Sequence, residues 1–213
     1  MAKILILNGH PEADSLTSEL ASSYEQAARR GAEVERIDLR ELAFELVLQK
    51  EHAGRALEPD LARAQDAIRR AQHVVWMFPT WWSGPPALMK GFCERVLTTG
   101  FAFQYRGRYQ TPTRLLSGRS ARMICSMDSP SYWYRFVQRR PLHSAFLQHT
   151  LGFCGFAPLA TTLFHEVRFM DTAERSAALE RAAEDAARDV GRFRPKTAWS
   201  YRRFRALPTQ ASE

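Results

Sequence analysis

The sequence predicts a doubly wound α/β domain with a five-stranded parallel sheet in the strand order 2-1-3-4-5. Short apolar runs, typical of strands buried on both faces, alternate along the chain with segments of helical periodicity. Strand–helix units of this kind build parallel sheets through helical crossovers. Five such units favour this order, with a switch point between the first and third strands where ligands bind.

Five segments are expected to form strands. Four of them are short and mostly apolar, whereas the second alternates polar and apolar residues, as a strand at the edge of a sheet does. In chain order, these segments are residues 3–8, 33–39, 73–78, 120–127 and 160–164.

Helices are predicted over residues 16–30, 60–72, 86–97, 141–153 and 171–190. Gly31 is expected to stop the first helix and Gly191 the last. The last helix begins with a capping box, with Asp171 at the cap and Glu174 at the third position. Its apolar stripe is expected to consist of Leu179, Ala183, Ala186 and Val190. Residues 40–58 and 99–120 show no regular pattern.

The chain of 213 residues is long enough for one α/β domain with a full core. We assign residues 1–191 to this domain and residues 192–213 to a basic C-terminal extension. The extension holds six basic residues and one acidic residue, so it carries five of the seven net positive charges. The body of the domain is therefore close to neutral, and together with the lack of a nucleic-acid motif this argues against nucleic-acid binding.

The cysteines and the N-terminus favour a cytoplasmic protein. Cys93, Cys125 and Cys154 stand singly in apolar segments and form no C-x-x-C motif, which is typical of buried thiols in a reducing compartment. The chain starts Met-Ala-Lys and enters a strand pattern at once, so we expect no signal peptide. No apolar run is long enough to span a membrane, so we do not expect a transmembrane protein.

Two adjacent tryptophans follow the third predicted strand. Pro79 ends the apolar run, and residues 80–84 form a loop that contains Trp81 and Trp82. The loop lies at the carboxyl end of a strand, which is the edge where open α/β sheets bind ligands. Two indole rings beside backbone N–H groups suit a flat, polar-edged ring better than a sugar or a metal ion, and we expect no metal site. Ordinary core or interface aromatics are the alternative interpretation.

The loop after the first strand offers an anion site without a glycine-rich motif. It contains neither G-x-G-x-x-G nor G-x-x-x-x-G-K-[ST], so a dinucleotide fingerprint and a P-loop are both absent. Instead it places His10, Ser15, Thr17 and Ser18 around the start of a helix. Hydroxyl groups, free N–H groups and the helix dipole favour a phosphate, which a partly cationic imidazole would also suit. Simple helix capping by Ser15 and Thr17 is the alternative.

Four stretches of the chain resemble, in the same order, the NAD(P)H:quinone oxidoreductase family of flavodoxin-like flavoproteins. They are residues 8–10 with 15–17, residues 78–91, residues 100–105 and residues 152–156. The resemblance covers roughly residues 4 to 190, and the block 78–91 is its most specific part. A flavodoxin-like fold with the strand order given above is what this family implies.

The resemblance implies an enzyme that moves a hydride from NAD(P)H through a bound flavin to a quinone or a similar acceptor, by a ping-pong mechanism. It also implies a homodimer with flavin sites at the interface, where aromatics at the positions of Phe103 and Tyr105 reach the neighbouring protomer's pocket. The short chain favours FMN, and FAD is the other possibility. The family's flavin-phosphate loop maps onto His10, Ser15, Leu16 and Thr17, and its ring-cradling loop onto Pro79, Thr80, Trp81, Trp82 and Ser83.

The loop after the fourth strand departs from the family. Family members carry a glycine-rich stretch there, followed by a tyrosine and a histidine that handle protons, whereas residues 128–134 contain no glycine. Tyr132 or Tyr134 is a candidate for the tyrosine, and His143 is a candidate for the histidine. A histidine on a helix surface is the alternative interpretation of His143.

A second function class remains open. Some similar flavoproteins are soluble regulatory subunits of membrane potassium-efflux transporters, and the Arg-rich extension would suit acidic partners or lipid headgroups. A simple flavodoxin-type electron carrier is disfavoured, since such carriers are typically acidic and this chain is basic.

Overall fold

The computed structural model describes residues 1–49, 56–108 and 110–192. The basic extension predicted for residues 192–213 lies outside this part of the chain except for Arg192. Its proposed contacts with acidic partners or lipid therefore stay a prediction.

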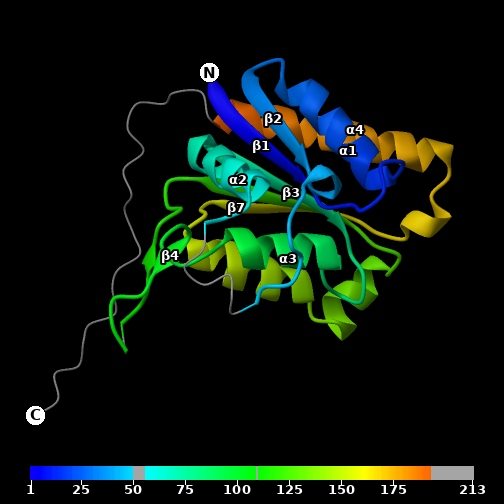
Figure 1. Ribbon diagram of the computed structural model, residues 1–213. Coiled ribbons are helices and arrows are strands. Elements are labelled where there is room, and N and C mark those ends of the chain that lie inside the picture. Colours follow the sequence, from blue (N-terminus) through cyan, green and yellow to red (C-terminus); the bar gives the residue numbers. More distant parts are fainter. Residues whose placement is uncertain (50–55, 109, 193–213) are drawn as a thin grey trace, which may run out of the picture.

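The central sheet contains five parallel strands in the order β2-β1-β3-β6-β7, which confirms the predicted strand order. Helices α1 and α4 cover one face of the sheet, and α2 and α3 cover the other (Figure 1). The strands are β1 (Ala2–Asn8), β2 (Ala32–Asp38), β3 (His73–Pro79), β6 (Ser120–Ser126) and β7 (Leu159–Phe164).

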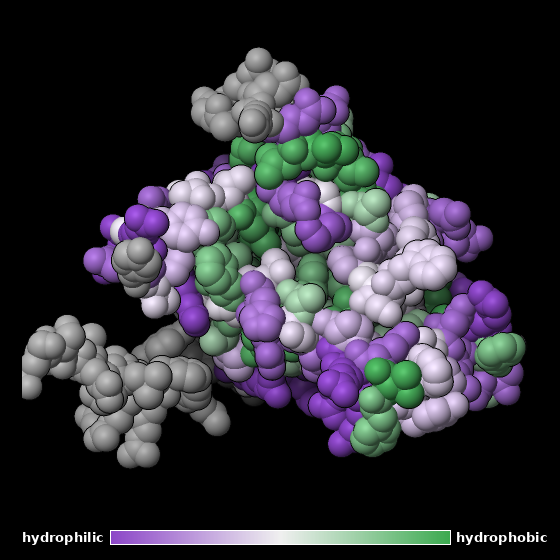
Figure 2. All heavy atoms as spheres, turned by 90° about the horizontal axis from the view of Figure 1, so that it is seen from below, coloured by the Kyte–Doolittle hydropathy of each residue, from purple (hydrophilic) through white to green (hydrophobic). Residues whose placement is uncertain are grey.

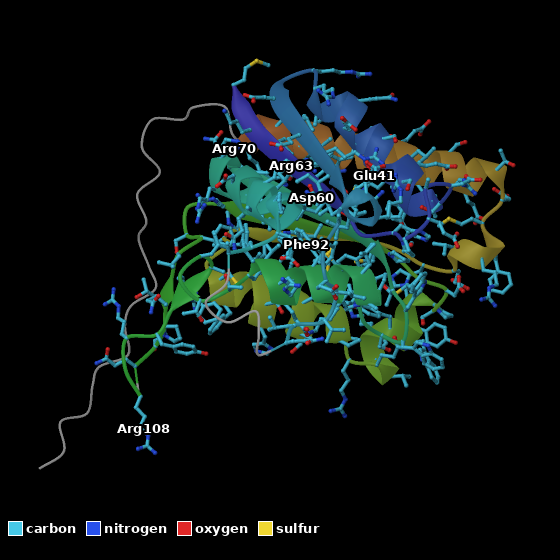
Figure 3. All side chains as sticks on the ribbon, in the orientation of Figure 1. Glu41, Asp60, Arg63, Arg70, Phe92 and Arg108 are labelled. Atoms are coloured by element: carbon cyan, nitrogen blue, oxygen red, sulfur yellow. The ribbon has the colours of Figure 1, made fainter. Side chains whose placement is uncertain are left out.

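The apolar strands supply both faces of the core because their side chains alternate between two layers. In β3, Trp76 and Phe78 pack toward α2 and α3, whereas Val75 and Met77 pack toward α1 and α4. All of β3 is buried, as its unbroken apolar run predicts. Phe92 of α3 belongs to the first of these layers, close to α2 (Figure 3).

The helices agree with the predicted segments except near the C-terminal end of the chain. The capping box of α4 is confirmed, because Asp171 and Glu174 each accept a hydrogen bond from the other's backbone N–H, at 2.8 and 2.9 Å. The predicted helix 141–153 is instead mostly a π-helix, η4, and a second π-helix, η3, precedes it. The bounds are α1 (Leu16–Ala28), α2 (Pro59–Arg70), α3 (Ala87–Val96), α4 (Thr172–Arg192), η3 (Trp133–Val137) and η4 (His143–Gly152), with 3₁₀ turns η1 (Leu39–Glu41) and η5 (Val167–Phe169).

Two further expectations are corrected. Gly191 does not end the last helix, since α4 continues to Arg192. Residues 99–120, expected to be irregular, contain a small antiparallel pair, β4 (Phe103–Gln104) and β5 (Thr113–Arg114). This hairpin lies on the left of Figure 1, at the end of the sheet where the parallel strands begin.

The buried face of α4 also differs from the predicted stripe, because it includes Asp185 and Asp189. Both carboxylates face Arg122, a buried arginine of β6. The Arg122 guanidinium donates two hydrogen bonds to the Asp189 carboxylate, at 2.6 and 2.9 Å. Tyr24 of α1 donates a third at 2.9 Å, so this ion pair joins α4 to both the sheet and α1. The three cysteines are free and buried, as predicted.

In the described part of the chain, no helix has the length and hydrophobicity needed to cross a bilayer.

Candidate functional site

A cavity of about 290 Å³ opens at the carboxyl ends of β3 and β6. It lies between the loop that follows β3 and the loops that follow β6 and β7, which is where parallel α/β sheets hold ligands. The loops touch at their base, where the Thr80 N–H donates to the carbonyl of Ser126 at 2.7 Å. The lining residues are Pro79, Thr80, Trp81, Trp82, Ser83, Ser126, Met127, Asp128, Ser129, Gln138 and Val167.

A tight turn presents the two tryptophans. Trp81 and Gly84 exchange backbone hydrogen bonds at 2.9 and 3.0 Å, which leaves Trp82 and Ser83 at the tip. Both tip residues have positive φ angles, 50° and 62°, as in a type I′ turn. Within the described residues, the N–H groups of Trp82 and Ser83 have no hydrogen-bond acceptor. The turn therefore offers two free donors beside an indole that is fully exposed.

The opposite wall of the cavity is held in place by the loop after β7. The His165 Nδ1 lies 3.0 Å from the carbonyl oxygen of Ser129, and the Met127 N–H donates to the carbonyl of Phe164 at 2.8 Å. An Arg168–Asp128 ion pair of 3.0 Å joins the same two loops at the surface. The loop after β6, which lacks glycine, is thus held by hydrogen bonds and an ion pair from the loop after β7.

The lining combines apolar surfaces with polar groups that lack partners. The Thr80 hydroxyl oxygen is buried and makes no hydrogen bond within the described residues. An orphaned buried hydroxyl, two free amides and an exposed indole suit a flat ring with hydrogen-bonding edges. A flavin ring has this shape and chemistry, so the residues present fit that group. In the described part of the chain, no cluster of His, Cys, Asp or Glu is placed to hold a metal ion.

The loop after β1 forms the second part of the site. Ser15 is the N-cap of α1, and its hydroxyl accepts a hydrogen bond from the Ser18 N–H at 3.3 Å. This confirms the capping interpretation of Ser15 without excluding an anion, because Leu16 and Thr17 carry N–H groups that an α-helix leaves without internal acceptors. The N-terminus of α1 thus keeps the donors that a phosphate requires.

The two parts of the site meet through His10 and Trp81, whose rings pack edge to face with centroids 5.9 Å apart. Burial lowers the pKa of His10 below its usual range. The Nδ1 atom accepts a hydrogen bond from the Glu12 N–H at 3.0 Å. The imidazole therefore packs between the two loops, and a partly cationic imidazole beside a bound phosphate stays a prediction.

A buried asparagine, Asn8, supports the loop after β1. Its side-chain amide donates to the Ser18 hydroxyl at 3.1 Å and to the Asp38 carboxylate at 2.6 Å, while its carbonyl oxygen accepts from the His10 N–H at 3.2 Å. Asn8 therefore ties together the ends of β1 and β2, α1 and the loop. The position of Asn8 at the end of an apolar strand indicated a polar residue near the site, but its hydrogen-bond partners could not be predicted from the sequence.

The three predicted catalytic residues do not line the cavity. Tyr134 is only 2% exposed, and its hydroxyl lies 3.1 Å from Nδ1 of His143, behind the loop after β6. Burial raises the pKa of Tyr134 to about 12 and lowers that of His143. Tyr132 is 62% exposed. Tyr134 and His143 do form a pair, and a catalytic role for any of the three stays a prediction.

The predicted site residues did not include six that line the cavity: Ser126, Met127, Asp128, Ser129, Gln138 and Val167. Ser126 and Ser129 flank the end of β6, so their position after an apolar strand was a usable signal. Gln138 and Val167 reach the cavity from segments that carry no motif.

The comparisons with known proteins agree with this geometry. The family model for the flavodoxin-like fold matches residues 2–190. A Haemophilus influenzae protein described as an uncharacterized NAD(P)H oxidoreductase is 28% identical over 187 residues, which cover 84% of this chain and 92% of the relative. The ribosyldihydronicotinamide dehydrogenase (quinone) of Pongo abelii is 30% identical over 184 residues, covering 74% and 79%.

A solved structure gives the same result. The NAD(P)H:quinone oxidoreductase from Methanothermobacter marburgensis superimposes with a TM-score of 0.76 at 25% identity, covering 87% of this chain and 95% of that one. The family match extends over nearly the whole described chain, and the strand order agrees with it. The chain therefore belongs to the NAD(P)H:quinone oxidoreductase family of proteins with the flavodoxin-like fold, and it is an oxidoreductase.

Proposed function

We propose that the protein binds a flavin and uses it to transfer a hydride from NAD(P)H to a quinone or a similar small acceptor in the cytoplasm. The observation that carries this proposal is the turn at Trp82 and Ser83: both residues line a cavity of about 290 Å³, their N–H groups have no acceptor among the described residues, and the Trp82 indole is exposed. The flavin's phosphate would bind at the N-terminus of α1, through Leu16 and Thr17. The domain of residues 1–191 would hold the whole of this site.

FMN is the flavin we favour. The ring and one phosphate match the cavity and the start of α1, which His10 and Trp81 connect. The adenosine half of FAD would have to lie beyond the phosphate. A hollow of about 500 Å³ beside α1 begins there, with Ser18, Ser22 and Arg36 in its lining, but it is shallow. The mass of the flavin released from the purified protein distinguishes the two.

The protein's part in the reaction is to position and stabilise. When bound, the flavin supplies the redox chemistry, taking two electrons and a proton from NAD(P)H and passing them to the acceptor. The N–H groups of Trp82 and Ser83 would donate to the ring where negative charge develops. Donor and acceptor would stack in turn in one pocket, which predicts a ping-pong mechanism and requires no nucleophilic side chain.

Tyr134 and His143 are proposed to hold a proton for this reaction. Their 3.1 Å contact joins a phenol with a raised pKa to an imidazole with a lowered pKa, so both groups are neutral near pH 7. The tyrosine hydroxyl therefore keeps its proton at neutral pH; passing that proton on would leave a tyrosinate, which a proton relayed through His143 would restore. Tyr132, which is exposed, would contact the acceptor from outside the cavity.

A homodimer would complete the site. Apolar side chains are exposed near the cavity in η3 and η5, among them Phe136, Val137 and Phe169. Exposed hydrophobic residues occur in groups on the face shown in Figure 2, and such groups mark interaction surfaces. Tyr105 is also exposed, and its hairpin lies at the opposite end of the sheet from its own cavity (Figure 1). It would therefore reach the pocket of the second copy.

Steady-state kinetics test this function. We expect the flavin-loaded protein to oxidise NADH or NADPH only when a quinone such as menadione is present, with the parallel double-reciprocal lines of a ping-pong mechanism. Intersecting lines would refute the shared pocket. A flavin-loaded protein that oxidises neither nucleotide with any quinone would refute the enzymatic function and favour a regulatory role.

A further inference from the structure

Gln138 reaches the cavity because of an unusual backbone path. Its N–H donates to the carbonyl of Trp133, five residues earlier, at 3.0 Å, which closes the π-helix η3. A π-turn holds one more residue than an α-helical turn and frequently occurs at functional sites. The extra residue changes the direction in which the following side chain points.

The two residues that follow Gln138 also have an unusual backbone conformation. Arg139 and Arg140 have positive φ angles of 57° and 54°, and neither is a glycine. A non-glycine residue in this region costs about 1 kcal/mol, so two in succession persist only where the surroundings enforce them. Here the Arg140 N–H donates to the carbonyl of Tyr134 at 2.9 Å, and Tyr134 is itself buried. The buried Tyr134, paired with the half-buried His143, thus anchors the turn that carries Gln138.

Gln138 lines the cavity, and its side chain has no hydrogen-bond partner among the described residues. Asp128, which also lines the cavity, is already paired with Arg168 at 3.0 Å. Within the segment from Tyr132 to His143, Gln138 is the one residue that lines the cavity. Its amide has two donors and one acceptor, and it does not titrate between pH 2 and 12.

We propose that Gln138 donates a hydrogen bond to the polar edge of the bound flavin and thereby raises the flavin's reduction potential. This inference rests on the proposed function. Reduction places negative charge on the ring, and a neutral N–H donor stabilises that charge without having to give up a proton. Gln138 is thus a positioning and tuning residue, and the proton itself comes from elsewhere.

Two substitutions test the inference in FMN-loaded protein. Gln138→Leu removes the donor at similar size, and we expect the reduced flavin to be destabilised about tenfold relative to the oxidised flavin, a lowering of about 30 mV. Gln138→Glu places a negative charge at the same point, so we expect a larger lowering that diminishes as the carboxylate is protonated at low pH. The matched control is Gln148→Leu in η4, an exposed glutamine that does not line the cavity and should leave the potential unchanged.

The potentials are measured by equilibrating each variant with a reference dye during xanthine oxidase reduction, and thermal unfolding checks that each variant is folded. If Gln138→Leu and Gln138→Glu bind FMN and share the potential of the wild type, the inference is wrong and the proposed function stands. A wild-type chain that binds neither FMN nor FAD overturns both.

Discussion

Polar groups gather in two regions of this molecule, beneath α4 and at the carboxyl ends of β3 and β6, and their hydrogen bonding differs between the two. Beneath α4, the carboxylate of Asp189 receives hydrogen bonds from Arg122 and Tyr24. In the cavity, among the described residues, the Thr80 hydroxyl and the amides of Trp82 and Ser83 have no partner. Paired groups stabilise the fold, whereas unpaired groups and positive φ angles persist where a ligand supplies the missing contacts.

This comparison predicts that substitutions beneath α4 change stability and leave ligand binding intact, and that substitutions in the turn do the reverse.

Asp189→Asn should give the largest loss of stability. It leaves the buried Arg122 guanidinium without its bidentate carboxylate, and breaking a buried pair costs about 3–5 kcal/mol. The matched control is Asp66→Asn, because Asp66 pairs with Arg69 on the surface at 2.9 Å and should contribute less than about 1 kcal/mol. Urea unfolding gives both values, and FMN affinity should be unchanged. Equal losses in the two variants would contradict the account.

The same pair predicts how stability depends on pH. Burial alone would raise the pKa of Asp189, but hydrogen bonds from Arg122 and His73 outweigh it and hold that pKa well below the usual range. A carboxyl with a depressed folded-state pKa stabilises the protein above its unfolded-state pKa of about 4, and this stability is lost as the pH falls further. The difference between the wild type and Asp189→Asn should be constant from pH 5 to 8 and shrink below about pH 4. A gap that narrows already between pH 8 and 5 would show that another group is responsible.

Trp82→Ala should weaken the flavin complex without changing stability. The indole is fully exposed, so its removal opens no space in the core. Loss of one aromatic stack removes about 0.5–1.5 kcal/mol beyond the buried area, so we expect roughly tenfold weaker FMN binding. Isothermal titration calorimetry measures the affinity and differential scanning calorimetry the melting temperature. The control is Val47→Ala, another exposed apolar residue that is remote from the cavity lining. A lowered melting temperature with unchanged affinity would reverse the assignment.

Ser83→Gly should give the smallest effect, and with the opposite sign. Serine at a φ of 62° is strained, and glycine relieves this strain, which stabilises the turn by up to about 1 kcal/mol. Flavin binding should be preserved because the N–H group remains. Ser176→Gly, inside α4, should instead destabilise by about 0.5 kcal/mol because glycine is a poor helix former. If both glycine variants lower the stability equally, the turn is not strained.

Much of the fold followed from local patterns, because burial on two faces leaves a direct trace in the sequence. The apolar run that became β3 and the capping box at Asp171 both predicted the elements that form. The cavity-facing turn was also predictable, since Trp81 and Trp82 follow a strand that ends at the binding edge. These features depend on residues that are close in the sequence.

The features that could not be predicted depend on partners far apart in the chain. Asp185 and Asp189 lie outside the predicted apolar stripe of the last helix, and their burial is explained by Arg122 in β6. Gln138 lies just before two residues with positive φ angles, Arg139 and Arg140. Neither residue is a glycine, so nothing in the sequence indicated this turn. Single-residue propensities therefore gave no sign of either feature.

The most direct test of the central claim is a titration of the purified protein with FMN, and separately with FAD, followed by tryptophan fluorescence. The account predicts saturable quenching at one flavin per chain, most of it lost in a Trp81→Phe, Trp82→Phe double variant that still binds flavin. Quenching that does not saturate with either flavin, or that is unchanged in the double variant, would contradict a ring bound beside this turn.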